Sequence, residues 1–293
     1  MINTSISGVR QILAQYGLHP HKGLGQNFLV DKNILSKIVA DSDIAATDTV
    51  LEIGTGLGAL TLLLAEAAGQ VVTVEIDKKL SPILEEVFND NKNIRLIRGD
   101  FLQLDWEADL LINPEMVREQ LIVCANLPYY ITSPIIFNIL EHGASVRHAV
   151  LMMQKEVAER LLAKPGTKQY GLLTVMVSWR ADVLLVTRVS RNCFYPVPDV
   201  DSVVVKIVPL KEARVSVKDE RLFVRLVRET FQKRRKTILN VLVGGGFANR
   251  EAGQDLCHQL GIDPSCRGET FYVEDFARLA DALFASRENK ESL

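Results

Sequence analysis

Residues 49–80, "TVLEIGTGLGALTLLLAEAAGQVVTVEIDKKL", constrain the fold more than any other stretch of the chain. A buried apolar strand leads into a glycine-rich turn, a helix with apolar residues at helical spacing follows, and a second apolar strand ends at Glu75. This order of elements is a βαβ unit. The sequence therefore predicts a sheet that contains parallel strands.

Strand-like apolar runs recur after this unit. They are "NIRLIRGD", "QLIVCAN", "RHAVLMMQ", "DVLLVTRVS" and "DSVVVKIVPL", and helix-like segments separate the earlier ones. This alternation predicts a mostly parallel sheet covered on both faces. After Pro209 the segments become helical and polar, so we predict a Rossmann-like α/β domain over residues 1–209 and a small helical domain over residues 210–293.

The composition sets the class of protein. A chain of 293 residues with 47% hydrophobic content can fill a core. No apolar run approaches the roughly 20 residues that a membrane span needs, and the first residues lack an apolar signal-peptide core. We therefore expect a soluble cytoplasmic protein without a membrane partner. The four cysteines lie far apart without metal-ligand spacing, so no metal site is indicated.

The glycine turn predicts a nucleotide cofactor. Gly54, Gly56 and Gly58 follow the first strand, and Glu75 ends the next strand 21 residues after Gly54. A tight turn with incidental glycines is the structural alternative. A dinucleotide-binding site is a stronger alternative, because Gly54, Gly56 and Ala59 also match the G-x-G-x-x-G/A pattern. The spacing alone does not separate these cofactors.

The neighbouring charges favour S-adenosylmethionine. Glu52 ends the first strand beside the glycines, and Asp100 ends the third strand in "RGDFLQLD". Such a cluster of carboxylates repels a pyrophosphate and attracts a cofactor with an ammonium and a sulfonium group. We expect Glu75 to bind the ribose diol and Asp100 the adenine amino group, although both residues also suit helix caps. The predicted fold class is thus a Rossmann-like S-adenosylmethionine-dependent methyltransferase sheet with a small C-terminal helical domain.

The fourth strand ends in "NLPYY", residues 126–130, where open α/β sheets place their chemistry. The lone pair of a nucleobase amine is delocalised into the ring, so the amine is a poor nucleophile. The Asn126 side-chain oxygen, with a backbone carbonyl of the Leu127–Pro128 turn that Pro128 holds rigid, can accept the two amino hydrogens and favour a pyramidal nitrogen. Tyr129 offers a face for stacking a base. The structural alternative is a strand-exit turn whose aromatic rings pack on the next helix.

Positive charge is concentrated near one end of the chain. The net charge of −2 argues against a generic nucleic-acid binder, but residues 211–250 carry eleven Lys and Arg against four Asp and Glu. Across residues 219–243 there is no proline, so one helical stripe is expected at i, i+4, i+7, i+11 and i+14, formed by Arg221, Arg225, Arg228, Gln232 and Arg235. Three further cations broaden this stripe, namely Lys233, Arg234 and Lys236. A solvated face is the usual explanation, but the concentration of charge favours contact with RNA phosphates.

Seven motifs together resemble a known family. They are "HKGLGQNFLVD", "LEIGTGLGALT", "VEID", "GDFL", "NLPYYITSPI", "FYPVPDVDSVVVKI" and "FQKRRKTILN", and the sequence is similar over nearly its whole length to the KsgA-type small-subunit ribosomal RNA adenine dimethyltransferases. The resemblance implies a cofactor site that includes Asn27, Leu29, Gly54, Glu75, Asp100 and Asn126. It also implies an amino-terminal segment that covers the cofactor, and an aromatic residue, Phe194, that closes on the target base unless it belongs to the core.

The substrate that the resemblance implies is a pair of adjacent adenosines in a hairpin loop near the 3′ end of the small-subunit RNA, each methylated twice at N6. Immature 30S subunits would be the partner of a monomeric enzyme. Three alternatives remain open: a large-subunit RNA adenine methyltransferase of the macrolide-resistance type, a ribosome-assembly factor that no longer methylates, and, more distantly, a dehydrogenase.

Overall fold

The computed structural model describes residues 5–110 and 121–291. By their contacts the residues form two compact units. The first consists of Met1–Ala158 with Val183–Pro209, and the second of Glu159–Asp182 with Leu210–Leu293.

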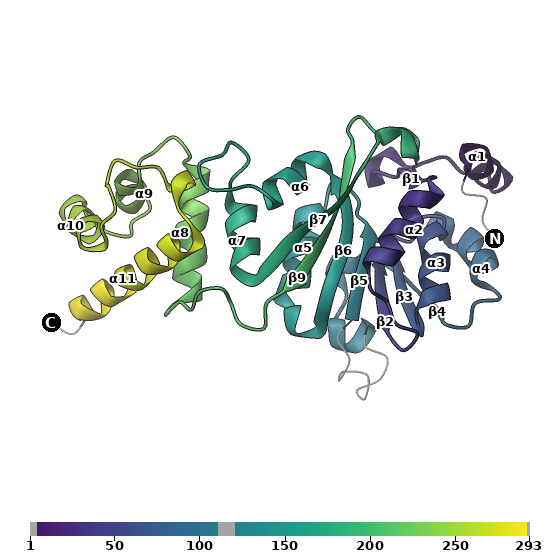
Figure 1. The fold of residues 1–293 in the computed structure, drawn as a ribbon, viewed down its shortest axis with the longest axis horizontal. Helices are drawn as coiled ribbons and strands as arrows, with labels where there is room; N and C mark the ends of the chain where they lie inside the picture. Colours follow the sequence, from purple (N-terminus) through teal and green to yellow (C-terminus); the bar gives the residue numbers. More distant parts are fainter. Residues whose placement is uncertain (1–4, 111–120, 292–293) are drawn as a thin grey trace. The chain divides into compact units, whose positions relative to one another are not determined.

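The first unit is built on a sheet whose strand order, within the described residues, is β4-β3-β2-β5-β6-β9-β7 (Figure 1). In chain order these strands are β2 (Thr49–Ile53), β3 (Gln70–Glu75), β4 (Ile94–Arg98), β5 (Leu121–Asn126), β6 (Val146–Gln154), β7 (Ala181–Val189) and β9 (Ser202–Pro209). The β2–β3, β3–β4, β2–β5 and β5–β6 pairs are parallel, and β9 runs antiparallel to β6. The predicted α/β fold with a mostly parallel sheet is confirmed.

Helices and a small ribbon complete the first unit. Its helices are α1 (Ile6–Gln15), α2 (Lys32–Asp41), α3 (Ala59–Ala67), α4 (Ser81–Phe88), α5 (Thr132–Glu141) and the start of α6 (Lys155–Leu161). Shorter turns of helix are η1 (Lys22–Leu24), η2 (Lys78–Leu80), η3 (Phe101–Gln103), η4 (Trp106–Leu110), η6 (Gly143–Ser145) and η7 (Arg191–Cys193). Strand β1 (Phe28–Leu29) pairs antiparallel with β8 (Phe194–Tyr195), which joins the amino-terminal segment to a distant part of the chain.

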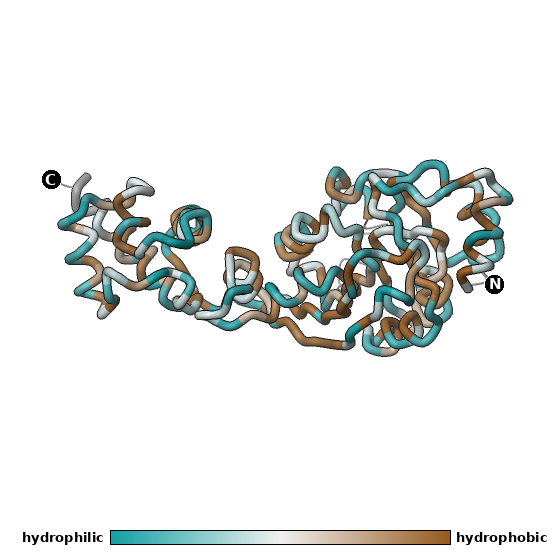
Figure 2. Tube along the Cα trace, turned by 90° about the horizontal axis from the view of Figure 1, so that it is seen from above, coloured by the Kyte–Doolittle hydropathy of each residue, from teal (hydrophilic) through white to brown (hydrophobic). Residues whose placement is uncertain are grey.

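The core of the first unit explains its apolar strands. Helices α2 and α3 bury side chains such as Leu35 and Leu64 against alternate strand residues such as Val50, Ile122 and Val150. Figure 2 shows hydrophobic and hydrophilic residues mixed along the helices, as expected for helices that each cover one side of a core.

The second unit is helical. Its helices are α7 (Leu172–Arg180), α8 (Glu220–Gln232), α9 (Ile238–Gly244), α10 (Arg250–Leu260) and α11 (Val273–Glu291), with a short turn η8 (Gly268–Thr270). Trp179 of α7 lies with its ring 4.7 Å from that of Phe223 of α8, and its Nε1 donates a hydrogen bond of 2.9 Å to the Val215 carbonyl. Because α7 supplies part of this core, residues 159–182 group with the helical unit, whereas the sequence placed them in the domain 1–209.

The basic helix is shorter than its sequence predicted. Helix α8 ends at Gln232 because Lys233 adopts φ −117° and ψ 43°, outside the helical region. Thr237 then caps α9 by accepting a hydrogen bond from the Asn240 backbone N–H. Arg235 therefore lies in the turn between the two helices and does not extend the stripe, which corrects the prediction of one continuous helix.

Candidate active site

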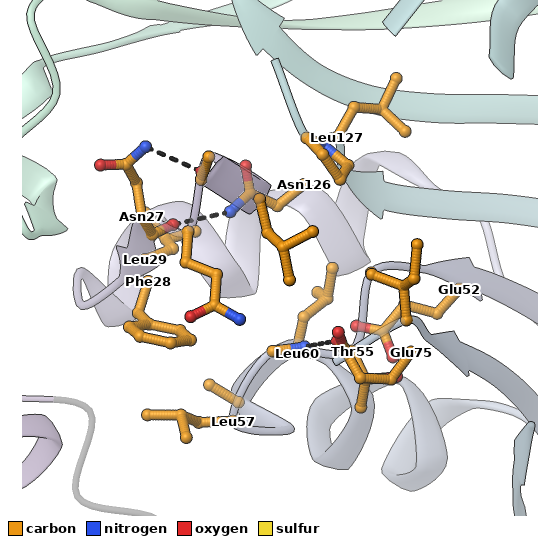
Figure 3. Close-up of a pocket in the computed structure, with 18 of the residues that line it drawn as sticks. Asn27, Phe28, Leu29, Glu52, Thr55, Leu57, Leu60, Glu75, Asn126 and Leu127 are labelled. Atoms are coloured by element: carbon orange, nitrogen blue, oxygen red, sulfur yellow. Dashed lines mark hydrogen bonds between the residues drawn. The ribbon is translucent and has the colours of Figure 1, made fainter. Parts of the chain in front are cut away.

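The strand order places a crevice at the carboxyl ends of β2 and β5. The chain adds β3 and β4 on one side of β2 and then returns to place β5 on the other side, which is the topological switch point where such sheets bind ligands. Glu52 of β2 is paired with Cys124 of β5, so Gly54 and Asn126, two residues further along, lie at the same level. A cavity opens here, and its walls include residues 24–29 of the amino-terminal segment and residues 126–129 after β5 (Figure 3).

Gly54 is favoured by its backbone conformation. Its φ is +85°, which other residues rarely adopt. A Cβ atom on Gly54 would lie 3.7 Å from both the Asn126 carbonyl oxygen and the Pro128 Cδ atom. These are ordinary van der Waals distances, so it is the positive φ that favours glycine at this position.

Glu75 is held by the glycine loop. Its Oε2 accepts a hydrogen bond of 2.8 Å from the Gly56 N–H, and its Oε1 accepts one of 2.8 Å from the Asp77 N–H. Burial raises the pKa of Glu75, and these backbone donors oppose that effect. A carboxylate has about four acceptor positions, so Glu75 keeps the capacity to accept hydrogen bonds from a diol.

Glu52 lines the cavity but is almost completely buried, with 1% of its surface exposed. Its Oε2 accepts hydrogen bonds from the Thr61 and Thr73 hydroxyl groups at 2.6 and 2.7 Å. Burial raises the pKa of Glu52 to about 8, against the effect of these hydroxyl groups. Burial therefore favours the protonated form of Glu52, whereas the sequence predicts a negative charge at this position beside the cofactor.

Asp100 lies outside the walls of the cavity as the described residues form them. It caps η3, where its Oδ1 accepts a hydrogen bond of 3.0 Å from the Leu102 N–H. Burial raises the pKa of Tyr130, and the charges of Asp100 and Glu75 raise it further. The two carboxylates therefore lie near one exposed tyrosine ring, and one of them, Glu75, lines the cavity.

Asn126 is oriented by the amino-terminal segment. Its Nδ2 donates a hydrogen bond of 3.3 Å to the Asn27 carbonyl oxygen, as Figure 3 shows. The Asn27 side chain in turn donates to the Gly25 carbonyl at 3.0 Å. No described residue donates a hydrogen bond to the Asn126 Oδ1 atom, so this oxygen is available as an acceptor. Leu29 also lines the cavity, two residues after Asn27.

The residues after Asn126 form a fixed turn. The buried Leu127 donates its N–H to the Met152 carbonyl at 2.9 Å. The Pro128 carbonyl accepts hydrogen bonds from the Ile131 N–H at 3.3 Å and the Thr132 hydroxyl at 3.1 Å. Tyr129 lines the cavity, and a hydrogen bond of 3.0 Å joins its hydroxyl to that of Ser202.

Phe194 does not line the cavity. It pairs with Leu29 across the β1–β8 ribbon and is completely buried in the core that α2 and α3 help to form. This arrangement is the core role that the sequence left open, and a ring that closes on a target base would first have to leave that core.

The structure also adds polar residues that the sequence did not single out. Gln26 and Thr55 line the cavity, and the Thr55 and Thr73 hydroxyl groups lie 2.7 Å apart. Thr61 was visible as a polar residue in the apolar run "ALTLLLA", but its contact with Glu52 depends on how α3 packs on the sheet.

The seven predicted RNA-binding cations divide into two groups. Three of them contact their own unit. The Arg225 guanidinium donates to the Gly245 carbonyl at 2.6 Å, Lys233 pairs with Glu229 at 2.8 Å, and Arg234 donates to the Lys168 carbonyl at 2.9 Å. The other four are exposed and have no side-chain partner among the described residues: Arg221, Arg228, Arg235 and Lys236.

Two other kinds of feature, a metal cluster and a membrane span, are not found in the described residues. No group of three or more His, Cys, Asp or Glu side chains among them is arranged to hold a metal ion. None of the helices in that part of the chain is both long and apolar enough to cross a membrane.

Comparison with known proteins identifies the family. A family model described as "Ribosomal RNA adenine dimethylase" matches residues 17–283. Two proteins named "Ribosomal RNA small subunit methyltransferase A" are similar: that of Clostridium botulinum (strain Loch Maree / Type A3) is 42% identical over 94% of this chain and 98% of its own. The protein of Geobacillus sp. (strain WCH70) is 45% identical over 94% of this chain and 95% of its own.

Solved structures agree. A dimethyladenosine transferase from Plasmodium falciparum superposes with a TM-score of 0.72 at 28% identity, over 90% of this chain and 98% of the other. The 23S rRNA methyltransferase ErmE superposes with a TM-score of 0.66 at 27% identity, over 88% of this chain and 100% of the ErmE chain. The predicted methyltransferase fold and enzyme class are thereby confirmed. The chain belongs to the ribosomal RNA adenine dimethylase family.

Proposed function

We propose that this protein transfers methyl groups from S-adenosylmethionine to the N6 atoms of two adjacent adenosines in small-subunit ribosomal RNA. The observation that carries the proposal is the free Oδ1 atom of Asn126, directed by the Asn27 carbonyl at the edge of a cavity that the glycine loop and Glu75 also line. The names of the curated relatives support the small subunit as the source of the RNA.

The donors and acceptors of the cavity fit this cofactor. When bound, it supplies an electrophilic methyl group on a sulfonium. Glu75 would accept hydrogen bonds from the ribose diol, and Gly54 and Gly56 leave space for the methionine part. Asp100, which lies beyond the cavity walls, would accept from the adenine amino group. Among the described residues that line the cavity there is no Lys, Arg or His. A cavity without cations suits a positively charged cofactor and disfavours the pyrophosphate of a dinucleotide.

Asn126 and Leu127 would prepare the nucleophile. The Asn126 Oδ1 atom and the Leu127 carbonyl oxygen each accept one hydrogen of the adenine amino group, so that the nitrogen lone pair turns toward the methyl group. The ring of Pro128 and the hydrogen bonds to its carbonyl hold this turn in place before the substrate arrives. The methylated amine is acidic and can lose its proton to water, so no general base is needed.

Aromatic and basic residues would hold the RNA. Tyr129 lines the same cavity as Asn126 and offers a face on which an extruded adenine can stack. Phe194 would contribute a second ring only after leaving the core. The exposed cations of α8 and the following turn would contact phosphates, which adds affinity without reading the sequence.

We also propose that the substrate is the immature 30S subunit, that the enzyme is a monomer and that it acts in the cytoplasm. The large-subunit alternative is not favoured: ErmE, named a 23S rRNA methyltransferase, is 27% identical to this chain, whereas two relatives named for the small subunit are 42% and 45% identical.

The test is transfer of tritiated methyl groups from S-adenosylmethionine to immature 30S subunits, 50S subunits and protein-free 16S RNA, followed by mapping of the modified bases. We expect label at two adjacent adenosines of the 30S RNA. Label confined to 50S subunits, or no transfer to any of the three substrates, would contradict the proposal.

A further inference from the structure

Gln26 connects the amino-terminal segment to the end of β3. Its side-chain Oε1 accepts a hydrogen bond of 2.8 Å from the His21 N–H, and its Nε2 donates one of 2.7 Å to the Asp77 Oδ2 atom. The Asp77 Oδ1 atom accepts from the Lys79 N–H at 3.0 Å, so both of its carboxylate oxygens are used. The bond from the amide to the carboxylate is charge-assisted and therefore stronger than one between neutral groups.

This contact lies on a continuous path across the cavity. On one side the Asp77 N–H donates to the Glu75 Oε1 atom at 2.8 Å. On the other side, the residue that follows Gln26 is Asn27, whose carbonyl accepts the 3.3 Å bond from the Asn126 amide. Gln26 and Asn27 both line the cavity.

We infer that Gln26 is a positioning residue that fixes the Asn27 carbonyl against the Asn126 amide and thereby sets the direction of the Asn126 Oδ1 atom. The inference rests on the proposed function and deepens it. The bond between Asn27 and Asn126 is long, so small movements of the segment that contains residues 21–29 would turn the amide away. The Asp77 carboxylate prevents that movement by holding Gln26 at the end of β3.

An exchange of the two polar groups tests this role. Gln26→Glu places two carboxylates opposite each other, whereas Asp77→Asn places an amide opposite the Gln26 amide. The double variant combines both changes, so the new amide at position 77 can donate to the new carboxylate at position 26. That carboxylate still accepts from the His21 N–H, and the amide oxygen at position 77 still accepts from the Lys79 N–H. The double variant therefore restores the interaction with its donor and acceptor reversed.

We expect each single variant to lower the single-turnover methylation rate by about tenfold or more at saturating cofactor and RNA, because small misplacements of a positioning group are costly. The double variant should recover to within about threefold of the wild type, which a merely structural loss would not do. Gln15→Glu, an exposed change on α1, is the matched control for added charge and should leave the rate unchanged. Circular dichroism and calorimetry with S-adenosylhomocysteine accompany each rate.

Two outcomes separate this inference from the proposed function. If the wild type methylates and the single variants do so at the same rate, or if the double variant is as slow as the product of the single effects, then Gln26 does not position Asn126. If the wild type itself transfers no methyl group, the proposed function fails and the inference fails with it.

Discussion

The Glu52 carboxyl is held in the interior of the first unit by two threonine hydroxyl groups, and burial raises its pKa to about 8. In the unfolded chain the pKa returns to its ordinary value of 4.5. Between these two pH values the folded chain keeps a proton that the unfolded chain has lost. The contribution of Glu52 to stability is therefore complete below pH 4.5 and is lost as the pH rises through about 8.

Glu52→Gln removes this dependence, because an amide can accept the same hydrogen bonds as the protonated carboxyl. We expect the melting temperature of the wild type to fall relative to that of Glu52→Gln as the pH is raised from about 5 to about 9. Differential scanning calorimetry measures both. Glu66→Gln, an exposed change on α3, is the control. Parallel pH profiles for wild type and Glu52→Gln would show that Glu52 is ionised in the folded chain.

Glu75 offers a second test at this scale. Replacing Glu75 with Ala should weaken the binding of S-adenosylhomocysteine by about one to two orders of magnitude, the reduction expected when charge-assisted hydrogen bonds to a buried ligand are removed. Isothermal titration calorimetry gives the affinity, and Glu75→Gln shows how much of the reduction comes from the charge. Heat of binding from NAD and none from S-adenosylhomocysteine would contradict the cofactor assignment.

At the scale of elements, α8 presents an apolar face to the core of its unit and a basic face to solvent. Leu222, Phe223 and Leu226 are buried, whereas Arg221 and Arg228 are exposed on the other face. Arg225 is a less suitable target for mutation, because its guanidinium also lies 4.6 Å from the centre of the Phe247 ring.

Changing Arg221, Arg228 and Arg235 together to Gln should lower RNA affinity and reduce the log–log salt slope by roughly one for each phosphate that is no longer neutralised. Cofactor affinity should not change. The control is an equal change of charge at three other exposed residues of the same unit, Lys211, Arg250 and Arg267. Equal effects of the two sets on the salt slope would mean that the basic face of α8 makes no specific contribution.

The elements show why sequence alone predicts some of this structure. The βαβ unit and the strand ends at Gly54 and Asn126 could be read locally, since buried parallel strands are continuous apolar runs that end at turn residues. The raised pKa of Glu52 could not be predicted in this way, because it comes from the burial of the side chain in the folded unit. The burial of Phe194 could not be predicted either, because it follows from pairing with Leu29, which lies 165 residues earlier in the chain.

At the scale of the whole molecule, the cavity belongs to the first unit and the basic helix to the second. Residues 159–182 interrupt the first unit in sequence but supply Trp179 to the core of the second. The chain therefore passes from one unit to the other more than once, and no single residue separates them.

Trp179→Ala tests this division. Removal of a completely buried tryptophan side chain costs about 3–5 kcal/mol of unfolding free energy. We expect hydrogen exchange, followed by mass spectrometry, to become faster in peptides of α7, α8 and α11 and to stay unchanged in β2, β3 and β5. Affinity for S-adenosylhomocysteine should be retained. Equally increased exchange in the sheet would show that the two units unfold together.

The proposed function of the whole chain rests on Asn126, which lies where the strand end, the amino-terminal segment and the cavity meet. The most direct test is the single-turnover rate of methylation of immature 30S subunits by Asn126→Ala, with the exposed Asn240→Ala on α9 as control and circular dichroism to verify folding. We expect the rate to fall by about 10² to 10³-fold, as when one preorganised polar group is removed from a transition state, with little change in RNA affinity. A folded Asn126→Ala protein that methylates at the rate of the wild type would contradict the proposed positioning of the adenine amine.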